Sequence, residues 1–514
     1  MTFYQGLISA RILLLLALAS LCIILALSER VSRRLRILSL IVMIGALVSY
    51  PNFGALHPQH SGYRAGHIHY YDAFHYFMGA KYFPEVGYYG LYETTLVAAH
   101  DLGGLRGIAA FRDLTSYTLR PAGSVDAEAV RARFSKARWQ MFKTDLTFFG
   151  PRIDAWPELL SDRGYNDPPA RALLLHWLVG RVRASAFTLT LLTSLDYVAV
   201  AVAFVMAWRA FGAIPSTLGL AFFALSFFAR FDWIGGSLLR WDWIAALLVG
   251  VAAYARGQGT AAGICLGYAA LARVFPLLFF VPLGIKWLQA RFRARPDPTL
   301  GACLRAGLGL MLLVSVGLVA SGEERTHTRE FLSKIRVHSQ DPFINSVGLS
   351  SVMVFGKATW TSNPDGTVYV TEGAISAARP APYLLPLMSA GYLLAVLPLL
   401  LRARPLASLM YAVPLIFCIL SLTGYYYSFL VLLVLLPREG DNGIDRIALV
   451  ETAVLAGFMA TSYAFEFASA DLLPLFYQAS IQLGLFFVVW VGLEYVRLGF
   501  LGRRFVGMTR HRSG

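Results

Sequence analysis

The sequence predicts an all-α fold, a polytopic bundle of about 12 to 13 membrane-spanning helices with two extracytoplasmic loop regions. Of its 514 residues, 57% are hydrophobic, and the mean hydropathy is +0.58. Charged residues make up only 15%, whereas a soluble domain has roughly 25%. Several apolar runs reach the length of about 20 residues that a helix needs to cross the hydrocarbon. A single cleaved signal peptide does not explain so many runs.

The expected membrane helices follow the apolar runs. They cover residues 10–28, 36–53, 186–208, 215–231, 241–255, 260–285, 303–321, 382–401, 406–422, 425–437, 447–467 and 475–497. The run at 260–285 should fold as a hairpin of two short helices that turns near Arg273 and Pro276, because proline removes a backbone donor and breaks a helix. A hairpin that is buried against protein is tolerated at membrane depth.

Basic residues set the expected orientation. The net charge is +15, and arginines gather in the short connections 29–36 and 286–295 and in the tail after residue 500. Short basic connections are typical of the cytoplasmic side, and the hairpin places all three segments on that side. We therefore expect a multi-pass protein of the cell inner (plasma) membrane, with an extracytoplasmic N-terminus and a cytoplasmic C-terminus. The same distribution indicates topology rather than nucleic-acid binding.

The spans divide the chain into six regions. They are two N-terminal transmembrane helices (1–53), a large extracytoplasmic loop with interfacial helices (54–185), a transmembrane bundle with the short hairpin near 260–285 (186–321), a second extracytoplasmic loop (322–381), the C-terminal transmembrane helices (382–500) and a basic cytoplasmic tail (501–514). Loops this long are usually functional or carry structure of their own. Segment 124–142 is amphipathic, which is typical of a helix in the membrane interface or of one packed on the loop region.

Residues 69–83, HYYDAFHYFMGAKYF, combine an acid with seven aromatic side chains just after the second apolar run. In a helix, Asp72, His75 and Tyr76 share a face, because side chains three and four residues apart are neighbours. A carboxylate on an outer helix end suits a general base that deprotonates an acceptor hydroxyl, and His75 would hydrogen-bond Asp72 or contact a phosphate. The alternative is an interfacial helix whose aromatic residues form a membrane belt.

Three arginines, Arg230, Arg240 and Arg273, lie inside or beside apolar runs. Burying an arginine at the bilayer centre costs about 2.5 to 3.5 kcal/mol, so such residues tend to be functional or paired. The planar guanidinium suits phosphate, and a donor phosphate at headgroup depth would account for these charges. The alternative for Arg230 and Arg240 is pairing with Asp232 and Asp242, whereas Arg273 has no acidic neighbour in the sequence.

The second loop region contains the polar segment KIRVHSQDPFINSVGLSS, in which His338 and Asn345 are further site candidates. This segment either binds a polar head or only solvates a loop. The sequence has no Gly-rich phosphate loop, no His-x-x-x-His pair and no Cys-x-x-Cys pair, and its four cysteines lie in or beside apolar runs. We therefore expect no metal site, no cofactor and no disulfide framework.

Short motifs follow one another along most of the chain. They are Asp72 with Tyr76, GYYGLY (87–92), GYNDPPARALLLHWLVG (164–180), Arg273 with Pro276, INSVGLSS (344–351) and GYYYSFLVLLVLLP (424–437). Their order resembles the GT-C superfamily of integral-membrane glycosyltransferases, and in particular the polyprenyl-phosphate-mannose-dependent mannosyltransferases of bacteria.

The resemblance implies a polyprenyl-phosphate sugar donor and a glycan, lipid or protein acceptor on the outer face. It also implies that Asp72 is the base in a direct displacement and that Arg273, where the family usually has lysine, contacts the donor phosphate. The chain departs from the family by an extra apolar segment before the Asp-bearing loop and by a long insertion before the Pro-Pro element. Asp72 is followed by Ala73 rather than by a second acid, which argues against a divalent metal.

The sequence thus favours a membrane glycosyltransferase with an aspartate base over two alternatives. A transporter or flippase of lipid-linked sugars would place ionisable residues along a path through the bundle and show a repeat between its halves. A sugar-polymer ligase or polymerase would carry its main outer loop late in the chain, whereas the longest loop here is early.

Overall fold

A computed structural model describes residues 3–57, 66–104, 107–338, 342–363, 367–436, 445–469 and 471–499. Six helices are long and apolar enough to cross a membrane: α1 (Phe3–Leu27), α11 (Ala186–Phe211), α17 (Pro298–Ala320), α21 (Leu384–Arg402), α25 (Arg446–Ala468) and α26 (Leu472–Arg497). Shorter helices complete the bundle: α2 (Arg33–Ser49), α12 (Ala213–Leu225), α14 (Asp242–Ala255), α15 (Gly259–Ala272), α16 (Phe280–Phe292), α22 (Pro405–Ser408), α23 (Ala412–Ile419) and α24 (Val431–Leu435). The predicted all-α polytopic fold is confirmed.

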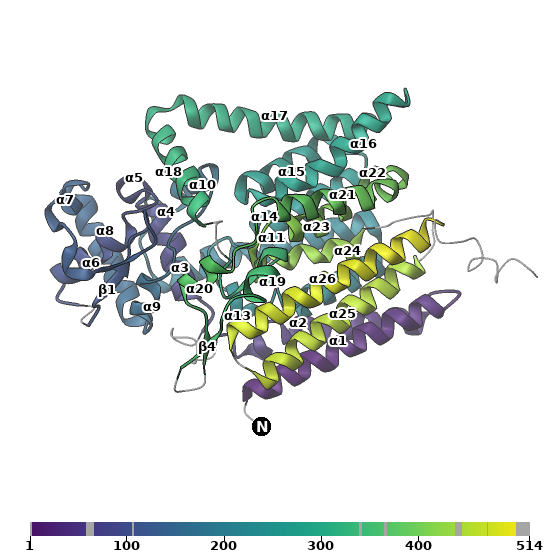
Figure 1. The fold of residues 1–514 in the computed structure, drawn as a ribbon, viewed down its shortest axis with the longest axis horizontal. Coiled ribbons are helices and arrows are strands. Elements are labelled where there is room, and N and C mark those ends of the chain that lie inside the picture. Colours follow the sequence, from purple (N-terminus) through teal and green to yellow (C-terminus); the bar gives the residue numbers. More distant parts are fainter. Residues whose placement is uncertain are drawn as a thin grey trace, which may run out of the picture.

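The first loop region folds into a layer of short helices at one end of the bundle, which we call the outer layer (Figure 1). Its helices are α3 (Tyr70–Ala73), the π-helical turn η3 (Phe74–Met78), α4 (Gly79–Lys81), α5 (Phe83–Val86), α6 (Leu91–Asp101), α7 (Ala127–Ala132), α8 (Lys136–Phe149), α9 (Trp156–Leu160) and α10 (Pro169–Val179). Segment 124–142 forms α7 and the start of α8, and it buries Val130, Phe134 and Phe142. Phe134 and Phe142 belong to the hydrophobic core of the outer layer.

Sheet structure in the described residues is confined to three antiparallel strand pairs. They are β1 (Ala110–Arg112) with β2 (Leu119–Pro121), β3 (Ser346–Val347) with β6 (Leu422–Thr423), and β4 (Thr361–Ser362) with β5 (Val368–Tyr369). Ser346 pairs with Thr423, so the second pair joins the second loop region to the Tyr-rich turn η8 (Gly424–Leu430). The second loop region also carries α18 (Gly322–His338), α19 (Leu349–Phe355) and α20 (Glu372–Ala377).

The bundle and the outer layer have separate hydrophobic cores. Aromatic side chains such as Phe222, Trp243 and Trp490 are buried in the bundle. Phe74 and Trp156 are buried in the outer layer, with their rings edge to face and 5.2 Å between centroids. In the outer layer, burial of a side chain such as Phe74 stabilises the fold by about 1.5 to 3 kcal/mol. The outer-layer core therefore fixes α3 and η3 over the end of the bundle.

Helices α15 and α17 run parallel and in close contact along a glycine stripe. A Cβ atom on Gly263 would lie 2.1 Å from the Cys303 carbonyl oxygen, and one on Gly267 would lie 2.9 Å from that of Gly307. Such small-residue stripes let backbones approach closely in membranes. At the end of α15, Arg273 is extended (φ −149°, ψ 106°). The chain then enters the turn η6 (Phe275–Phe279), which has Pro276 near its start.

Basic side chains gather at the end of the bundle remote from the outer layer, which we call the basic end. Here Arg256 donates to the Arg209 carbonyl oxygen over 3.2 Å, and Arg402 donates to that of Leu498 over 3.2 Å. Further arginines in these connections are Arg30, Arg33, Arg34, Arg291, Arg293, Arg295 and Arg404. This is the charge pattern expected of a cytoplasmic face, and the orientation of the termini stays a prediction.

Helix α18 is held on the outer layer by a buried lysine. The Lys334 ammonium group donates to the carbonyl oxygens of Tyr88 and Tyr165, each over 2.9 Å. Burial disfavours its charged form and lowers the pKa of Lys334 to about 7. The folded protein therefore binds this proton less tightly than the unfolded chain, in which the lysine has its usual pKa.

Stability should consequently depend on pH through Lys334. Between about pH 10 and pH 7 the unfolded chain binds more protons at this lysine, so the free energy of unfolding should fall as the pH falls and level off below about pH 7. We expect the thermal unfolding midpoint to drop from pH 9 to pH 6.5 by more in the wild type than in Lys334→Met. An equal drop in both proteins would contradict the assignment.

Candidate functional site

Asp72 is positioned by a glycine turn between α13 (Phe231–Ile234) and α14. The His69 N–H donates to the Gly236 carbonyl oxygen over 3.0 Å, and His69 Nδ1 in turn accepts from the Asp72 N–H over 3.2 Å. Gly236 has φ +70°, which favours glycine, and a Cβ there would lie 1.7 Å from the His67 carbonyl oxygen. The turn therefore fixes the first residues of α3, and Asp72 with them.

Tyr76 contacts the same guanidinium group as Asp72, that of Arg240, because the helix widens into the π-helical turn η3. Asp72 Oδ2 lies 3.4 Å from Arg240 Nε, and the Tyr76 ring centroid lies 4.1 Å from the Arg240 guanidinium carbon. In a π turn the rotation per residue is smaller, so the side chain four residues on stays close to Asp72. Such turns are frequent at functional sites.

Arg240 is held from both sides by elements far apart in the sequence. The backbone N–H groups of Arg240 and Trp241 donate to the Asp196 carboxylate of α11 over 2.6 and 3.0 Å. At the other end of the side chain, Arg240 Nη2 donates to the Tyr425 hydroxyl of η8. Arg240 is buried, and its guanidinium group lies between Asp72 and the Tyr-rich turn.

Arg171 of α10 is fully partnered. Its Nε donates to Asp242 over 2.9 Å, its Nη1 pairs with Asp167, and its Nη2 donates to the Leu239 carbonyl oxygen. The Tyr268 hydroxyl of α15 also donates to Asp242, over 2.9 Å. This buried network ties the outer layer to the start of α14 and to α15.

Arg273 shares Asp167 with Arg171 but has unused donors. Its Nη1 pairs with Asp167, whereas Nε and Nη2 are buried without a hydrogen-bond partner among the described residues. Arg240 has the same feature, since its Nε and Nη1 are buried and make no hydrogen bond there. Arg171, Arg240 and Arg273 all lie within 6 Å of the Tyr76 ring centroid, at 5.7, 4.1 and 5.9 Å. We call these three residues the arginine cluster.

This arrangement is suited to binding an anion. A buried donor without a partner costs about 1 to 3 kcal/mol, and the cluster holds three such nitrogen atoms among the described residues, Nη1 of Arg240 and Nε and Nη2 of Arg273, whereas Nε of Arg240 faces Asp72. Phosphate oxygens form strong, charge-assisted hydrogen bonds with guanidinium groups. Among the described residues, no group of three or more His, Cys, Asp or Glu side chains is placed to hold a metal ion. The carboxylate of Asp72 borders the cluster, and its side chain is 15% exposed.

The structure brings Asp72, Tyr76, Arg240 and Arg273 together and places His75 elsewhere. His75 Nε2 lies 2.8 Å from the Tyr92 hydroxyl, and Nδ1 lies 3.2 Å from the Tyr71 carbonyl oxygen. Burial lowers the pKa of His75, which disfavours the charged ring that would attract a phosphate.

Arg230 belongs to a separate ion cluster. It lies 3.6 Å from Asp232 and pairs with Glu466, while Arg11 of α1 lies 3.3 Å from Asp232. Asn52 also donates to Asp232, over 2.6 Å. These contacts join α1, α13 and α25, which makes Arg230 a packing residue of the bundle.

The two candidates of the second loop region lie at different places. Asn345 directly precedes β3, and its carbonyl oxygen accepts from the Gly424 N–H over 2.9 Å. It is therefore hydrogen-bonded to the first residue of η8, the turn that carries Tyr425. His338 is the last residue of α18, and its side chain is outside the described part of the chain.

Sequence reasoning overlooked the partners of the arginines. Asp167 and Arg171 are four residues apart, as i and i+4 neighbours at the start of a helix would be, and this spacing was the available signal. The alternative pair of Arg240 with Asp242 does not form, because Asp242 binds Arg171 and Arg240 contacts Asp72. Residues two apart do not face each other at a helix start.

Comparisons with known proteins do not identify a family for this chain. No family model matches the chain, and neither a curated protein nor a solved structure matches it. The function must therefore be argued from the arginine cluster and its surroundings.

The glycine turn can be tested by substitution. Gly236→Ala should cost about 1 to 2 kcal/mol for the left-handed backbone conformation alone, and more for the clash with the His67 carbonyl group. Gly257→Ala is the control, because Gly257 has φ +76° and no neighbouring atom within 4 Å of a Cβ. Thermal unfolding should show the larger loss for Gly236→Ala. Equal losses would mean that the turn does not hold residues 67–69.

Arg171 and Arg273 should differ in their contribution to stability. Arg171→Met leaves Asp242 without its guanidinium partner and Asp167 with Arg273 alone, and breaking a buried pair costs about 3 to 5 kcal/mol. Arg273→Met should cost less, because Asp167 keeps Arg171 and because Nε and Nη2 of Arg273 have no hydrogen-bond partner among the described residues. Unfolding midpoints of the two variants measure the difference. A loss for Arg273→Met as large as that for Arg171→Met would make Arg273 structural.

Proposed function

We propose that this chain is a membrane glycosyltransferase that moves a sugar from a polyprenyl-phosphate donor to an acceptor on the extracytoplasmic face. The observation that carries the proposal is the set of three buried guanidinium nitrogen atoms, Nη1 of Arg240 and Nε and Nη2 of Arg273, that lack a hydrogen-bond partner among the described residues. They lie at the end of an apolar bundle, where a lipid-borne phosphate would meet them, and next to a carboxylate.

The donor phosphate would bind between Arg240 and Arg273. Arg171 is neutralised by Asp167 and Asp242 and offers no free donor. Arg240 keeps Nη1 for a ligand, since its Nε faces Asp72, and Arg273 keeps Nε and Nη2. The Tyr425 hydroxyl orients Arg240, so the binding geometry is set before the donor arrives. Preorganised donors of this kind stabilise the charge that develops on a leaving group.

Asp72 would act as the general base. Its Oδ2 faces Arg240 and is buried, whereas the side chain as a whole is 15% exposed. In the proposed step, Asp72 takes the proton of an acceptor hydroxyl and the hydroxyl oxygen attacks the anomeric carbon. The bond from that carbon to the phosphate oxygen breaks, and its electron pair leaves with the polyprenyl phosphate. A positioned base contributes about 10² to 10⁴ in rate.

The arrangement of charges favours transfer over transport. The Arg230 cluster and the arginine cluster lie toward the outer layer, and Glu494 pairs with Arg497 near the basic end. A transporter or flippase of lipid-linked sugars instead requires ionisable residues along a path between the two faces.

The deciding experiment measures sugar transfer in proteoliposomes. A panel of polyprenyl-phosphate donors with radiolabelled sugars would be offered to wild type, Asp72→Asn and the control Asp154→Asn, which alters an exposed carboxylate of the same region. We expect wild type and control to release or transfer label, and Asp72→Asn to lose at least about 10² in rate. Equal turnover by Asp72→Asn would refute the base, and label that crosses the bilayer on its lipid would favour a flippase.

Donor binding tests the phosphate site separately. Arg273→Gln removes a charge-assisted contact worth about 1.5 to 3 kcal/mol, so the donor Kd should rise roughly 10- to 100-fold. Arg295→Gln, at the basic end, is the control and should bind as wild type does. Unchanged binding by Arg273→Gln would remove Arg273 from the site.

A further inference from the structure

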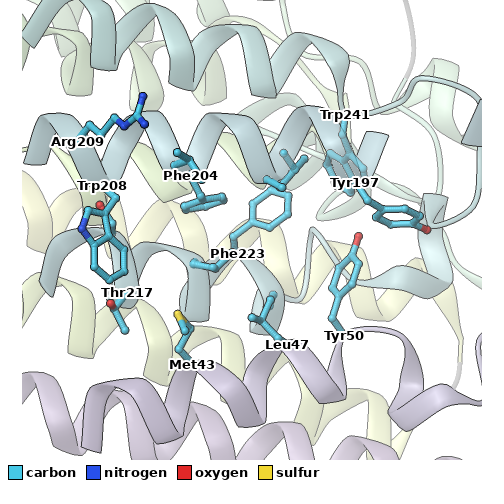
Figure 2. A pocket seen from close by; sticks show the side chains of 16 residues that line it. Met43, Leu47, Tyr50, Tyr197, Phe204, Trp208, Arg209, Thr217, Phe223 and Trp241 are labelled. Atoms are coloured by element: carbon cyan, nitrogen blue, oxygen red, sulfur yellow. The ribbon is translucent and has the colours of Figure 1, made fainter. Parts of the chain in front are cut away.

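A long apolar groove runs along the bundle between α2, α11 and α12. Its volume is about 570 Å³, within the range of about 300 to 1,000 Å³ that is usual for ligand sites. Figure 2 shows Tyr50, Tyr197 and Trp241 at one end of the groove and Trp208 and Arg209 at the other. Its middle is lined by apolar side chains that include Leu47, Val200, Phe204, Leu220 and Phe223. The groove therefore follows the direction of the lipid chains.

The groove is separate from the candidate site, and its polar end lies elsewhere. Its lining contains none of Asp72, Arg171, Arg240 and Arg273. The only charged residue in the lining is Arg209, which is exposed and lies at the basic end of the bundle. Arg256 donates to the Arg209 carbonyl oxygen over 3.2 Å and brings a second positive charge close to the mouth.

Two further features at this mouth favour an anion. Ser216 lines the groove, is 2% exposed, and its Oγ has no hydrogen-bond partner among the described residues. It lies in the first turn of α12, whose N-cap residue Gly212 supplies no side-chain hydrogen bond. The first N–H groups of a helix carry a partial positive charge and bind phosphate. The buried hydroxyl group of Ser216, the N-terminus of the 13-residue helix α12 and Arg209 thus lie at one end of the apolar groove.

We propose that this groove binds an anionic glycerophospholipid of the leaflet at the basic end. One acyl chain lies between α2, α11 and α12, and the headgroup phosphate contacts Arg209. The Ser216 hydroxyl donates to an oxygen of the phosphate or of the adjacent ester. The site is independent of the proposed glycosyl transfer, because the donor would bind from the opposite end of the bundle.

Native mass spectrometry of the delipidated protein tests this site. Phosphatidylglycerol and phosphatidylcholine with identical acyl chains are titrated into wild type and Arg209→Gln. One arginine near a headgroup is worth about a fivefold change in affinity. We expect wild type to prefer phosphatidylglycerol, and Arg209→Gln to bind it roughly fivefold more weakly. The loss for phosphatidylcholine should be smaller, because its choline cation offsets the charge of the phosphate. Equal binding of both lipids to wild type would overturn the proposal.

A groove-filling substitution locates the bound chain. Ala201→Trp places an indole in the groove and should weaken both lipids, whereas Val198→Trp alters an exposed residue of the same helix outside the lining and should weaken neither. No effect of Ala201→Trp would place the lipid elsewhere and overturn the proposal. Undecaprenyl phosphate is the third probe. If it binds wild type more tightly than phosphatidylglycerol and Ala201→Trp abolishes its binding, the groove belongs to the sugar donor instead.

Discussion

The guanidinium group of Arg171 is the interaction on which the site depends. It binds Asp167 of the segment before α10 and Asp242 at the start of α14, and Asp167 in turn pairs with Arg273 at the end of α15. The outer layer, α14 and α15 are therefore held in one buried network. Because this network satisfies Arg171 and both carboxylates, the remaining open donors belong to Arg240 and Arg273. Charge pairing that stabilises the fold also determines which arginines stay available to a ligand.

Much of the bundle follows from the sequence because lipid imposes a simple length rule on apolar helices. The chain turns at Arg273 as the sequence indicates, since the backbone is extended at this residue before it enters the turn η6, which contains Pro276. Other ends differ. The apolar run at 215–231 becomes a helix that stops at Leu225, and Arg230 follows in extended backbone. Hydropathy alone does not predict that Arg230 pairs with Glu466 of α25.

Single members of the candidate site were predictable, and their assembly was not. A buried arginine or an acid beside aromatic residues stands out in an apolar chain, which is why Asp72, Arg240 and Arg273 were identified. Their partners, Asp167 and Asp196, come from other elements, and only tertiary packing brings them close. His75 shows the same limit. A regular α-helix predicts a face shared with Asp72, whereas the π-helical turn directs the ring to Tyr92.

The glycine stripe between α15 and α17 also sets how far below the surface the candidate site lies. Gly267 is level with Gly307, so Arg273, six residues on, is level with Leu313 of the parallel helix. Helix α17 continues to Ala320, about 10 Å farther at 1.5 Å per residue, and Val316 and Val319 on this stretch are exposed. A phosphate that contacts Arg273 must therefore lie deeper in the bilayer than the lipid headgroups. A substrate anchored by a long flexible chain can enter sideways from the bilayer, whereas a free sugar phosphate in water has no comparable route.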